Sequence, residues 1–365
     1  MLFPKTTNYR SVKVHAGTAT IDDGETIDAT QKKILVTGGA GYIGAHIAVE
    51  LLQHGHPVVI LDDLSNAKEE TVERIGELAQ KSPVFWRGDV TSEAELEKVF
   101  QKHVFWAVVH LAALKSVAHS EKTPLDYFHT NVSGTVALLR VMERHGCRRI
   151  VYSSSASVYG NTETVPIPHT QRRNPASCYG ETKEMSERIL EKLAACNAQW
   201  SVSILRYFNP GGAHPSGLIG EDPRGQPNNV LPCIAQAAVG ESDGVTVFGT
   251  DYNTPDGTCV RDYIHVVDLA KGHLSALAYI EKRRGVSVHN LGSGEGRSVL
   301  ELIKTFQKIS GRVFSVEKGE RRKGDVAVLV ADPGKAGEDL GWTSRHSVED
   351  ICRDAFAWKK KNMSL

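Results

Sequence analysis

Short apolar runs alternate with longer segments of helical periodicity from residue 33 onward. The runs that we interpret as strands are residues 34–36, 58–61, 84–86, 107–111, 149–153 and 201–206. The first of them is apolar throughout rather than alternating with polar residues, as expected for a strand buried on both faces. Helical segments such as residues 42–54 separate the runs. The pattern predicts an α/β fold with a doubly wound parallel sheet.

The pattern changes after residue 206, where prolines and glycines interrupt the chain repeatedly. Expected helices then follow at residues 231–239, 267–280, 299–308 and 348–359, and expected strands at residues 245–248, 286–290 and 313–316. We therefore predict a first domain over residues 32–206 and a smaller C-terminal α/β domain over residues 207–365. Residues 1–31 mix acids and bases without a clear period, which predicts a disordered tail.

The charge balance narrows the classes of partner. The 365 residues include 43 basic and 43 acidic side chains, which gives a formal net charge of zero. Without an excess of positive charge, electrostatic attraction to nucleic acid or to an anionic membrane surface is weak, so neither is an expected partner. The sequence contains no apolar run of membrane-spanning length and no apolar secretory signal near its start.

The six cysteines are scattered and form no Cys-x-x-Cys pair. This spacing argues against a zinc ribbon and against a disulfide scaffold, so no metal site is expected. A reducing compartment, the cytoplasm, fits the cysteine usage best.

Three glycines spaced three apart follow the first apolar run and open the first helix: Gly38, Gly41 and Gly44. Glycines there let backbone N–H groups approach a pyrophosphate, and the helix directs its positive end toward it. Asp62 and Asp63 end the next strand, where an acid can bind an adenosine ribose and would repel a 2′-phosphate. The pattern indicates a Rossmann-type domain that binds NAD rather than NADP, although a glycine triplet alone can be a plain turn.

A second constellation follows the serine run of residues 153–155. Tyr179 and Lys183 lie four apart at the start of an expected helix, so the phenol and the ammonium share a face. A tyrosine has a pKa of about 10, but a cation about 4 Å away at an effective dielectric of about 20 contributes roughly 4 kcal/mol, or about three pKa units. Lys183 could thereby make Tyr179 a usable general base.

Tyr-x-x-x-Lys is a short pattern, and the chain contains a second copy from Tyr9 to Lys13. That copy precedes the glycine loop and follows no strand. Context therefore favours Tyr179 and Lys183 for catalysis, over the alternative of a surface ion pair or a packed aromatic.

Polar and aromatic residues cluster in three stretches of the second domain, at residues 205–217, 226–232 and 261–268. Asn209 and Asn229 offer amide donors and acceptors, and Arg261 and Arg322 offer planar forks suited to phosphate. Flat faces for a base or a sugar come from Phe248 and Tyr263. Each of these side chains could equally be a solvated surface residue or part of the core.

Several motifs together resemble those of the extended short-chain dehydrogenase/reductases, and within them the UDP-glucose 4-epimerases. The resemblance extends from Lys33 to Trp358 and rests on VTGGAGYIG, ALKSV, SSSASVYG, YGETK, RYFNPGGAHPSG, GEDPRGQPNN, DGTCVRDYIHVVDLA, HNLGSG and RRKGD. It implies Tyr179 as catalytic base, Lys183 as its partner and Ser155 as the hydroxyl beside the sugar.

The resemblance also implies two sets of binding residues. The NAD set comprises Gly38, Gly41, Tyr42, Ile43, Gly44, Asp62, Asn66, Asp89, Val90, Lys115, Tyr179 and Lys183. The UDP-sugar set comprises Asn131, Ser155, Asn209, Asn229, Phe248, Arg261, Arg322, Asp325 and Leu329. A homodimer is implied as well, through the helices expected at residues 124–145 and 179–195.

The implied reaction interconverts UDP-galactose and UDP-glucose by transient oxidation at C4 of the sugar, rotation of the 4-keto intermediate and return of the hydride. Leu329 stands where related enzymes select for the sugar's 2-substituent, and its intermediate size predicts weak or no action on UDP-N-acetylglucosamine. The sequence departs from the family pattern at Leu111, His119, His169 and Cys178, none of which removes a catalytic group.

Three alternative functions would use the same nucleotide-binding site. Nucleotide-sugar dehydratases and decarboxylases need an additional acid after the serine run, where this chain has Ala156 and Ser157. A catalytically silent NAD-binding regulator would have no reason to keep Tyr179, Lys183 and Ser155 together. Among epimerases, pentose and uronic acid substrates remain open.

Overall fold

The computed structural model describes residues 32–225, 227, 229–322 and 325–363, together with the backbone of three short strands in the N-terminal part. These strands are β1 (Lys13–His15), β2 (Thr18–Thr20) and β3 (Thr26–Asp28), and they form an antiparallel sheet in the order β1-β2-β3. The rest of the predicted tail, including Tyr9, lies outside the described residues. The prediction of a disordered tail therefore stays a prediction.

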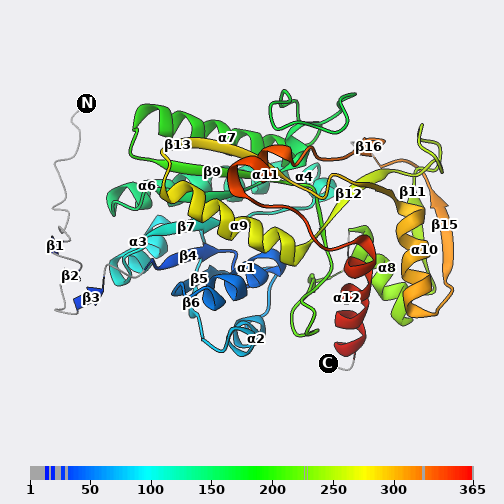
Figure 1. Ribbon diagram of the computed structural model, residues 1–365, viewed down its shortest axis with the longest axis horizontal. Helices are drawn as coiled ribbons and strands as arrows, with labels where there is room; N and C mark the ends of the chain where they lie inside the picture. The colour runs from blue at the N-terminus through cyan, green and yellow to red at the C-terminus, as the bar shows by residue number, and fades with distance from the viewer. Residues whose placement is uncertain are drawn as a thin grey trace.

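A sheet of seven strands forms the centre of the molecule (Figure 1). Every neighbouring pair in it is parallel, in the order β13-β9-β8-β7-β4-β5-β6. The strands are β4 (Ile34–Thr37), β5 (Val58–Asp62), β6 (Val84–Arg87), β7 (Ala107–His110), β8 (Arg149–Ser155), β9 (Ser201–Tyr207) and β13 (Gly285–Leu291). This arrangement confirms the predicted doubly wound parallel sheet.

Helices cover both faces of this sheet (Figure 1). One face packs against α1 (Tyr42–Gln53), α2 (Glu70–Ala79) and α9 (Val266–Glu281). The other packs against α3 (Glu93–Lys102), α6 (Gly134–Arg144) and α7 (Cys178–Cys196). Side chains of β4 alternate between the two cores, with Ile34 and Val36 in the first and Leu35 in the second. A strand covered on both sides buries every residue, which is why residues 34–36 are all apolar.

The C-terminal part surrounds a separate hydrophobic core, seen at the right of Figure 1. Its helices are α8 (Val230–Val239), α10 (Val299–Ser310) and α12 (Val348–Lys361), whereas α11 (Gly334–Leu340) packs on α9 and β13 of the central layer. One small sheet contains β10 (Asn209–Gly211), β12 (Val260–His265), β14 (Gly296–Ser298) and β16 (Val328–Leu329). A second contains β11 (Gly244–Phe248) and β15 (Ser315–Gly319), paired in parallel.

The spatial division does not coincide with the predicted boundary at residue 206. Strand β13 pairs with β9 along its whole length, and α9 packs on α1. Both elements therefore belong to the first layer although they follow β10 and α8 in the sequence. The boundary at residue 206 stays a proposal for where the chain first leaves the sheet.

The segment from Pro124 to His145 differs from the single helix that its sequence predicts. It divides into α5 (Pro124–Tyr127), a π-helical turn η1 (Phe128–Ser133) and α6, after the short helix α4 (Val117–Ser120). Within the turn, the carbonyl of Asn131 accepts from the hydroxyls of Thr135 and Ser186. Side-chain hydroxyls thus replace part of the regular backbone ladder, which a pattern of apolar positions cannot reveal.

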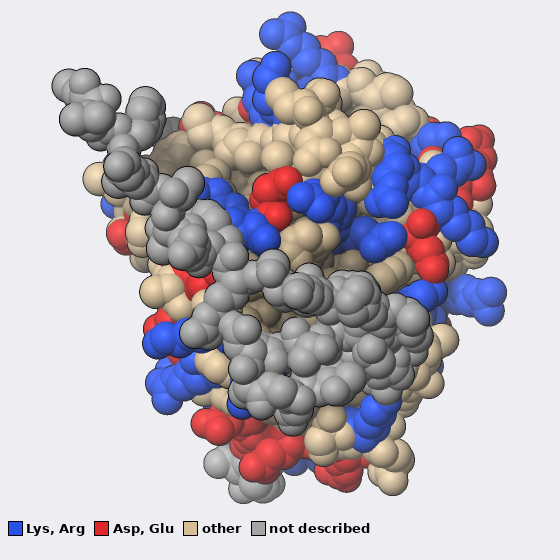
Figure 2. Space-filling view, turned by 90° about the vertical axis from the view of Figure 1, so that its left-hand side faces the viewer, with Lys and Arg blue, Asp and Glu red and all other residues tan. Residues whose placement is uncertain are grey.

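The surface charges follow the balanced composition. On the face shown in Figure 2, Lys and Arg side chains lie among Asp and Glu side chains. No helix in the described part of the chain is long and apolar enough to cross a membrane.

Candidate active site

A cavity of about 540 Å³ opens where the central strands end. It brings together most of the residues singled out from the sequence, from both halves of the chain. These are Gly38, Gly41, Tyr42, Ile43, Gly44, Asp62, Asn66, Asp89, Val90, Lys115, Ser155, Tyr179, Lys183, Asn209, Asn229 and Leu329. Both β4 and its neighbour β7 feed the cavity, and the strand order reverses between them, as at the ligand sites of other doubly wound sheets.

The glycine loop allows backbone to approach backbone closely. Gly38 has φ of +69°, and a Cβ there would lie 2.8 Å from the backbone nitrogen of Ala112. A Cβ on Gly44 would lie 2.2 Å from the carbonyl oxygen of Gly38. The N-cap residue of α1 is Gly41, and no side chain caps the helix. The loop therefore leaves a helix N-terminus open to the cavity, which is the geometry that holds a pyrophosphate.

Asp62 connects the end of β5 to this loop. Its carboxylate accepts hydrogen bonds from the backbone N–H groups of Ala40 at 3.0 Å and of Leu64 at 2.9 Å. Burial raises the pKa of Asp62, and these N–H donors partly offset the effect. The side chain thus both orders the glycine loop and lines the cavity.

Tyr179 and Lys183 project from the first turns of α7. Ser177 is the N-cap residue and accepts from the N–H of Gly180 at 3.1 Å, so the helix begins just before the tyrosine. The Lys183 ammonium is buried and donates to the carbonyl of Ser153 at 2.7 Å. This bond holds the lysine against the serine run at the end of β8.

The pKa of Tyr179 differs from the value expected from the sequence. Burial raises the pKa of Tyr179 to about 12, and a hydrogen bond with Ser155 offsets this only in part. Burial also lowers the pKa of Lys183 to about 7. The Lys183 ammonium lies 5.9 Å from the centre of the Tyr179 ring. The predicted lowering of the Tyr179 pKa by the lysine was wrong, because the loss of hydration outweighs the effect of a cation that is itself poorly hydrated.

A buried ionic network that the sequence did not predict supports this part of the site. The carboxylate of Glu187, one turn beyond Lys183 on α7, is inaccessible to solvent. It accepts from Arg206 at 2.9 and 2.7 Å, from Arg173 at 2.8 Å and from the hydroxyl of Ser154. Because Ser154 adjoins Ser155, the network ties α7 to the ends of β8 and β9. A lone glutamate in a helical pattern gives no signal of such pairing.

Four predicted substrate residues of the C-terminal part lie outside the residues that line the cavity: Phe248, Arg261, Arg322 and Asp325. They form a neighbouring cluster, with the Arg322 guanidinium 3.9 Å from the centre of the Phe248 ring and an Arg261–Asp325 ion pair at 3.8 Å. The cluster adjoins the cavity through the strand pairing of Arg261 with Leu329, which does line it.

The three predicted asparagines differ in their surroundings. Asn131 is buried, does not line the cavity, and uses its amide on the backbone of Leu114 and on Thr182. Its place is therefore behind the wall of the site rather than at the substrate. Asn209 lines the cavity, and its Oδ1 is buried without a hydrogen-bond partner among the described residues. Such an orphaned acceptor fits a site that completes its bonding with a ligand.

Other lining residues were missed by the sequence reasoning. The cavity wall also includes Tyr207 and Phe208 at the end of β9 and Glu221, Asp222 and Pro223 in the following loop. The three loop residues belong to the motif GEDPRGQPNN, which was used only as part of the family resemblance. Among the described residues, no group of His, Cys, Asp and Glu could hold a metal ion.

The departures from the family pattern leave the site intact. The backbone N–H of Cys178 donates to Glu121 at 2.9 Å, and the carbonyl of His169 accepts from Arg206 at 2.8 Å. Only Leu111 of the four lines the cavity. The other three positions lie outside the cavity wall.

Sequence comparison relates the chain to nucleotide-sugar enzymes. The family model for GDP-mannose 4,6 dehydratase matches residues 35–355. UDP-glucose 4-epimerase of Bacillus subtilis is 48% identical over 331 residues, covering 91% of this chain and 98% of the relative. The human UDP-glucose 4-epimerase is 44% identical over 343 residues, covering 91% and 98%.

Solved structures agree. A UDP-glucose 4-epimerase from Stenotrophomonas maltophila, with bound NAD and formylated UDP-arabinopyranose, has a TM-score of 0.89 and 47% identity, covering 92% of this chain and 99% of that one. The enzyme from Bifidobacterium longum, in complex with NAD⁺ and UDP, has a TM-score of 0.89 and 43% identity, covering 90% and 98%. The chain therefore belongs to the UDP-glucose 4-epimerase family.

Proposed function

We propose that this protein is an NAD-dependent isomerase that interconverts UDP-galactose and UDP-glucose. The observation that carries the proposal is the convergence of Tyr179, Ser155 and Lys183 on the cavity that the glycine loop also lines. Two relatives that match this chain over nearly their whole length are both named UDP-glucose 4-epimerase. NAD and a UDP-sugar are bound in structures of similar chains.

The residues of the main cavity fit NAD. The open N-terminus of α1 and the close approach of Gly38 suit the pyrophosphate, while Asp62 and Asp63 disfavour the 2′-phosphate of NADP. Asn66, Asp89, Val90 and Lys115 line the same cavity and would complete the cofactor site. When bound, NAD supplies a hydride acceptor and donor for C4 of the sugar.

The protein's own groups handle the proton. Tyr179 takes the proton of the 4-hydroxyl as the carbinol becomes a ketone, and Ser155 hydrogen-bonds the same oxygen. In the described structure Tyr179 holds its proton firmly, since burial raises its pKa to about 12. A positive charge that enters beside the phenol would favour its ionised form.

The sugar nucleotide would lie toward the C-terminal part of the cavity. Arg261 and Arg322 would anchor the diphosphate, Phe248 and Asp325 the remainder of the nucleotide, and Asn209 and Asn229 polar groups nearer the sugar. Because the UDP moiety would be held firmly, the 4-keto sugar could rotate without leaving the site and present its other face for return of the hydride. Asn131 would act indirectly, by holding the backbone of Leu114.

Leu329 would set the tolerance for the sugar's 2-substituent. It lines the cavity and packs beside a small cluster that includes Ile167, Phe208 and Ala331. A leucine between these neighbours restricts the space more than a smaller residue would. We therefore expect a much lower kcat/KM for UDP-N-acetylglucosamine than for UDP-galactose.

The position after the serine run argues against dehydration chemistry, although the matching family model bears a dehydratase's name. Residues 156 and 157 are alanine and serine, and the N–H and hydroxyl of Ser157 are bonded to Ser155 at 3.1 Å. No carboxylate stands there to move protons at neighbouring carbons.

We also infer a homodimer. Large apolar side chains are exposed on neighbouring helices: Leu125 of α5 is 80% exposed and Met185 of α7 is 45% exposed. Helices α4, α5 and α7 contact one another. Such an apolar surface favours association with a second copy.

A reducing compartment, the cytoplasm, is consistent with the cysteines. All six lie in the described part of the chain and all are free.

The direct test is to incubate the purified protein with UDP-galactose, without added NAD, and to separate the products. We expect UDP-glucose to form up to the equilibrium ratio, with no net NADH. An inert protein that still binds NAD would contradict the proposal and favour a regulatory role.

A further inference from the structure

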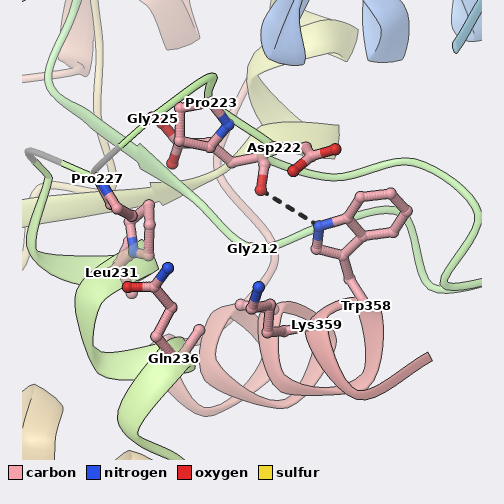
Figure 3. A pocket seen from close by; sticks show the side chains of 13 residues that line it. Gly212, Asp222, Pro223, Gly225, Pro227, Leu231, Gln236, Trp358 and Lys359 are labelled. Carbon is pink, nitrogen blue, oxygen red and sulfur yellow. Dashed lines mark hydrogen bonds between the residues drawn. The ribbon is translucent and has the colours of Figure 1, made fainter. Parts of the chain in front are cut away.

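A short segment crosses between the two sides of the main cavity. Residues 221–225, here called the bridging segment, contact the cofactor side through an Asp222–Lys68 ion pair of 2.6 Å and through Arg224, whose N–H donates to Asn66 at 3.2 Å. On the opposite side, the Trp358 indole of α12 donates to the carbonyl of Glu221 at 3.3 Å (Figure 3). The backbone at Glu221 is therefore held from the C-terminal part.

Glu221 itself faces the cavity, and its side chain is only 11% exposed. One carboxylate oxygen, Oε1, accepts from the Lys115 ammonium at 2.9 Å and from the Asn229 amide at 3.2 Å. Both partners line the same cavity. Lys115 follows β7 beside the glycine loop, whereas Asn229 precedes α8. A single oxygen thus joins a residue of the cofactor side to a residue of the sugar-nucleotide side.

The bond fixes the orientation of Asn229. An ionised carboxylate only accepts, so the asparagine must turn its NH₂ group toward Glu221 and its Oδ1 away. Asn229 is the N-cap residue of α8, yet its side chain makes no capping bond. Asparagine is one of the strongest N-cap residues, so the side chain has left a favourable position for the carboxylate.

The carboxylate also raises an electrostatic problem. A sugar nucleotide is anionic, and an unpaired negative charge in the wall of its site would oppose binding. The Lys115 ammonium cancels that charge at the observed 2.9 Å. Removal of Lys115 would leave Glu221 negative and without its cationic partner.

We propose that Glu221 is a positioning residue that couples the two sides of the cavity, holding Asn229 for the sugar nucleotide while Lys115 neutralises it from the cofactor side. This rests on the proposed function, because it takes the cavity to hold NAD and a UDP-sugar. Glu221 contacts neither reacting atom, and its effect passes through the two residues that it holds.

The test is a rescue experiment, with UDP as the probe and the protein saturated with NAD. Calorimetry measures the Kd of UDP for the wild type, for K115M and for K115M/E221Q. We expect K115M to weaken UDP binding about tenfold, from a charge left uncompensated near an anion. The second substitution should restore the Kd to within about threefold of the wild-type value, since glutamine is neutral and still accepts from Asn229. Both variants lack Lys115, so any deficit in NAD binding is common to them.

The matched control is K68M, which removes a lysine from the neighbouring ion pair of the same segment. Lys68 does not line the cavity, and both members of its pair are about half exposed. K68M should leave the Kd of UDP unchanged. The effect of K115M should shrink when ionic strength rises from about 0.05 M to about 0.5 M.

The outcomes separate the two proposals. A K115M/E221Q double variant as weak as K115M, a K115M variant that binds UDP normally, or equal losses in K115M and K68M would each overturn the coupling. A wild-type protein that binds no UDP would overturn the proposed function itself. Restoration of UDP binding supports the coupling and is not expected from a residue that only maintains the fold.

Discussion

Single residues in this site owe their chemistry to burial. Tyr179 and Lys183 are adjacent on one helix face, but each is withdrawn from water, which raises the pKa of the phenol to about 12 and lowers the pKa of the ammonium to about 7. The motif Tyr-x-x-x-Lys identifies the pair and its shared face. It does not contain the burial, which comes from side chains distant in sequence, and so the direction of the tyrosine's pKa shift could not be predicted from it.

The buried lysine makes stability depend on pH. In the unfolded chain its pKa is about 10.4, so between pH 7 and pH 10 the unfolded state binds more protons than the fold, where the pKa is about 7. The penalty is fully present below pH 7 and is relieved as the pH rises. We expect the free energy of unfolding of the wild type to rise between pH 7 and pH 9 relative to K183M, by up to about 1.4 kcal/mol per pH unit.

Urea denaturation of both proteins at matched NAD concentration measures this difference. The comparison with K183M cancels the contributions of other titrating groups. Parallel pH dependences of wild type and variant would show that the lysine is hydrated in the fold.

Elements of secondary structure place these residues, and the turn between β4 and α1 is the most constrained. The glycine spacing predicted this turn and the helix after it, because only glycine permits so close a backbone approach. The π-helical turn η1 and the Glu187 network were not predictable in the same way. Both depend on polar partners, Thr135 and Arg206 for example, that become neighbours only after the sheet has formed.

Two glycine substitutions in this turn should differ in their effect. In Gly44→Ala the new Cβ would lie 2.2 Å from the Gly38 carbonyl, a backbone atom that cannot yield without moving the loop. In Gly41→Ala the nearest atom is 3.3 Å away. We expect both variants to lose NAD binding by at least about tenfold, G44A because the loop must move and G41A because its Cβ would lie where the backbone approaches the pyrophosphate. Only G44A should also lower the melting temperature of the protein without added NAD, and equal melting temperatures for G44A and G41A would contradict the described loop geometry.

In the whole molecule, the central parallel sheet could be predicted from the sequence, whereas the packing of the later elements against it could not. The parallel sheet was predicted from short apolar runs that alternate with helical segments. Strand β13 was recognised as a strand, but its position beside β9 was not, because the pattern of a strand does not state its partner. The cluster around Arg261 and Arg322 was likewise identified by residue type, while its position beside the cavity depended on how the small sheets pack.

We expect two copies of the chain to associate as a dimer. Leu125→Asp places a charge at a large apolar side chain of α5 that is 80% exposed. The variant should sediment as a monomer under conditions in which the wild type sediments as a dimer, because the charge would have to be desolvated in the interface. Val313→Asp is the control, since Val313 is exposed to a similar extent, 87%, but lies before β15. A V313D monomer or an L125D dimer would place the interface elsewhere.

The most direct measurement of the central claim is the turnover of UDP-galactose by Tyr179→Phe with bound NAD and UDP affinity measured alongside. We expect a kcat lower by about 10²- to 10⁴-fold, from loss of the group that takes the 4-hydroxyl proton, while NAD content and the Kd of UDP stay close to the wild-type values. Near-normal turnover with intact cofactor binding would contradict it, because the proton would then leave by a route that does not involve this phenol.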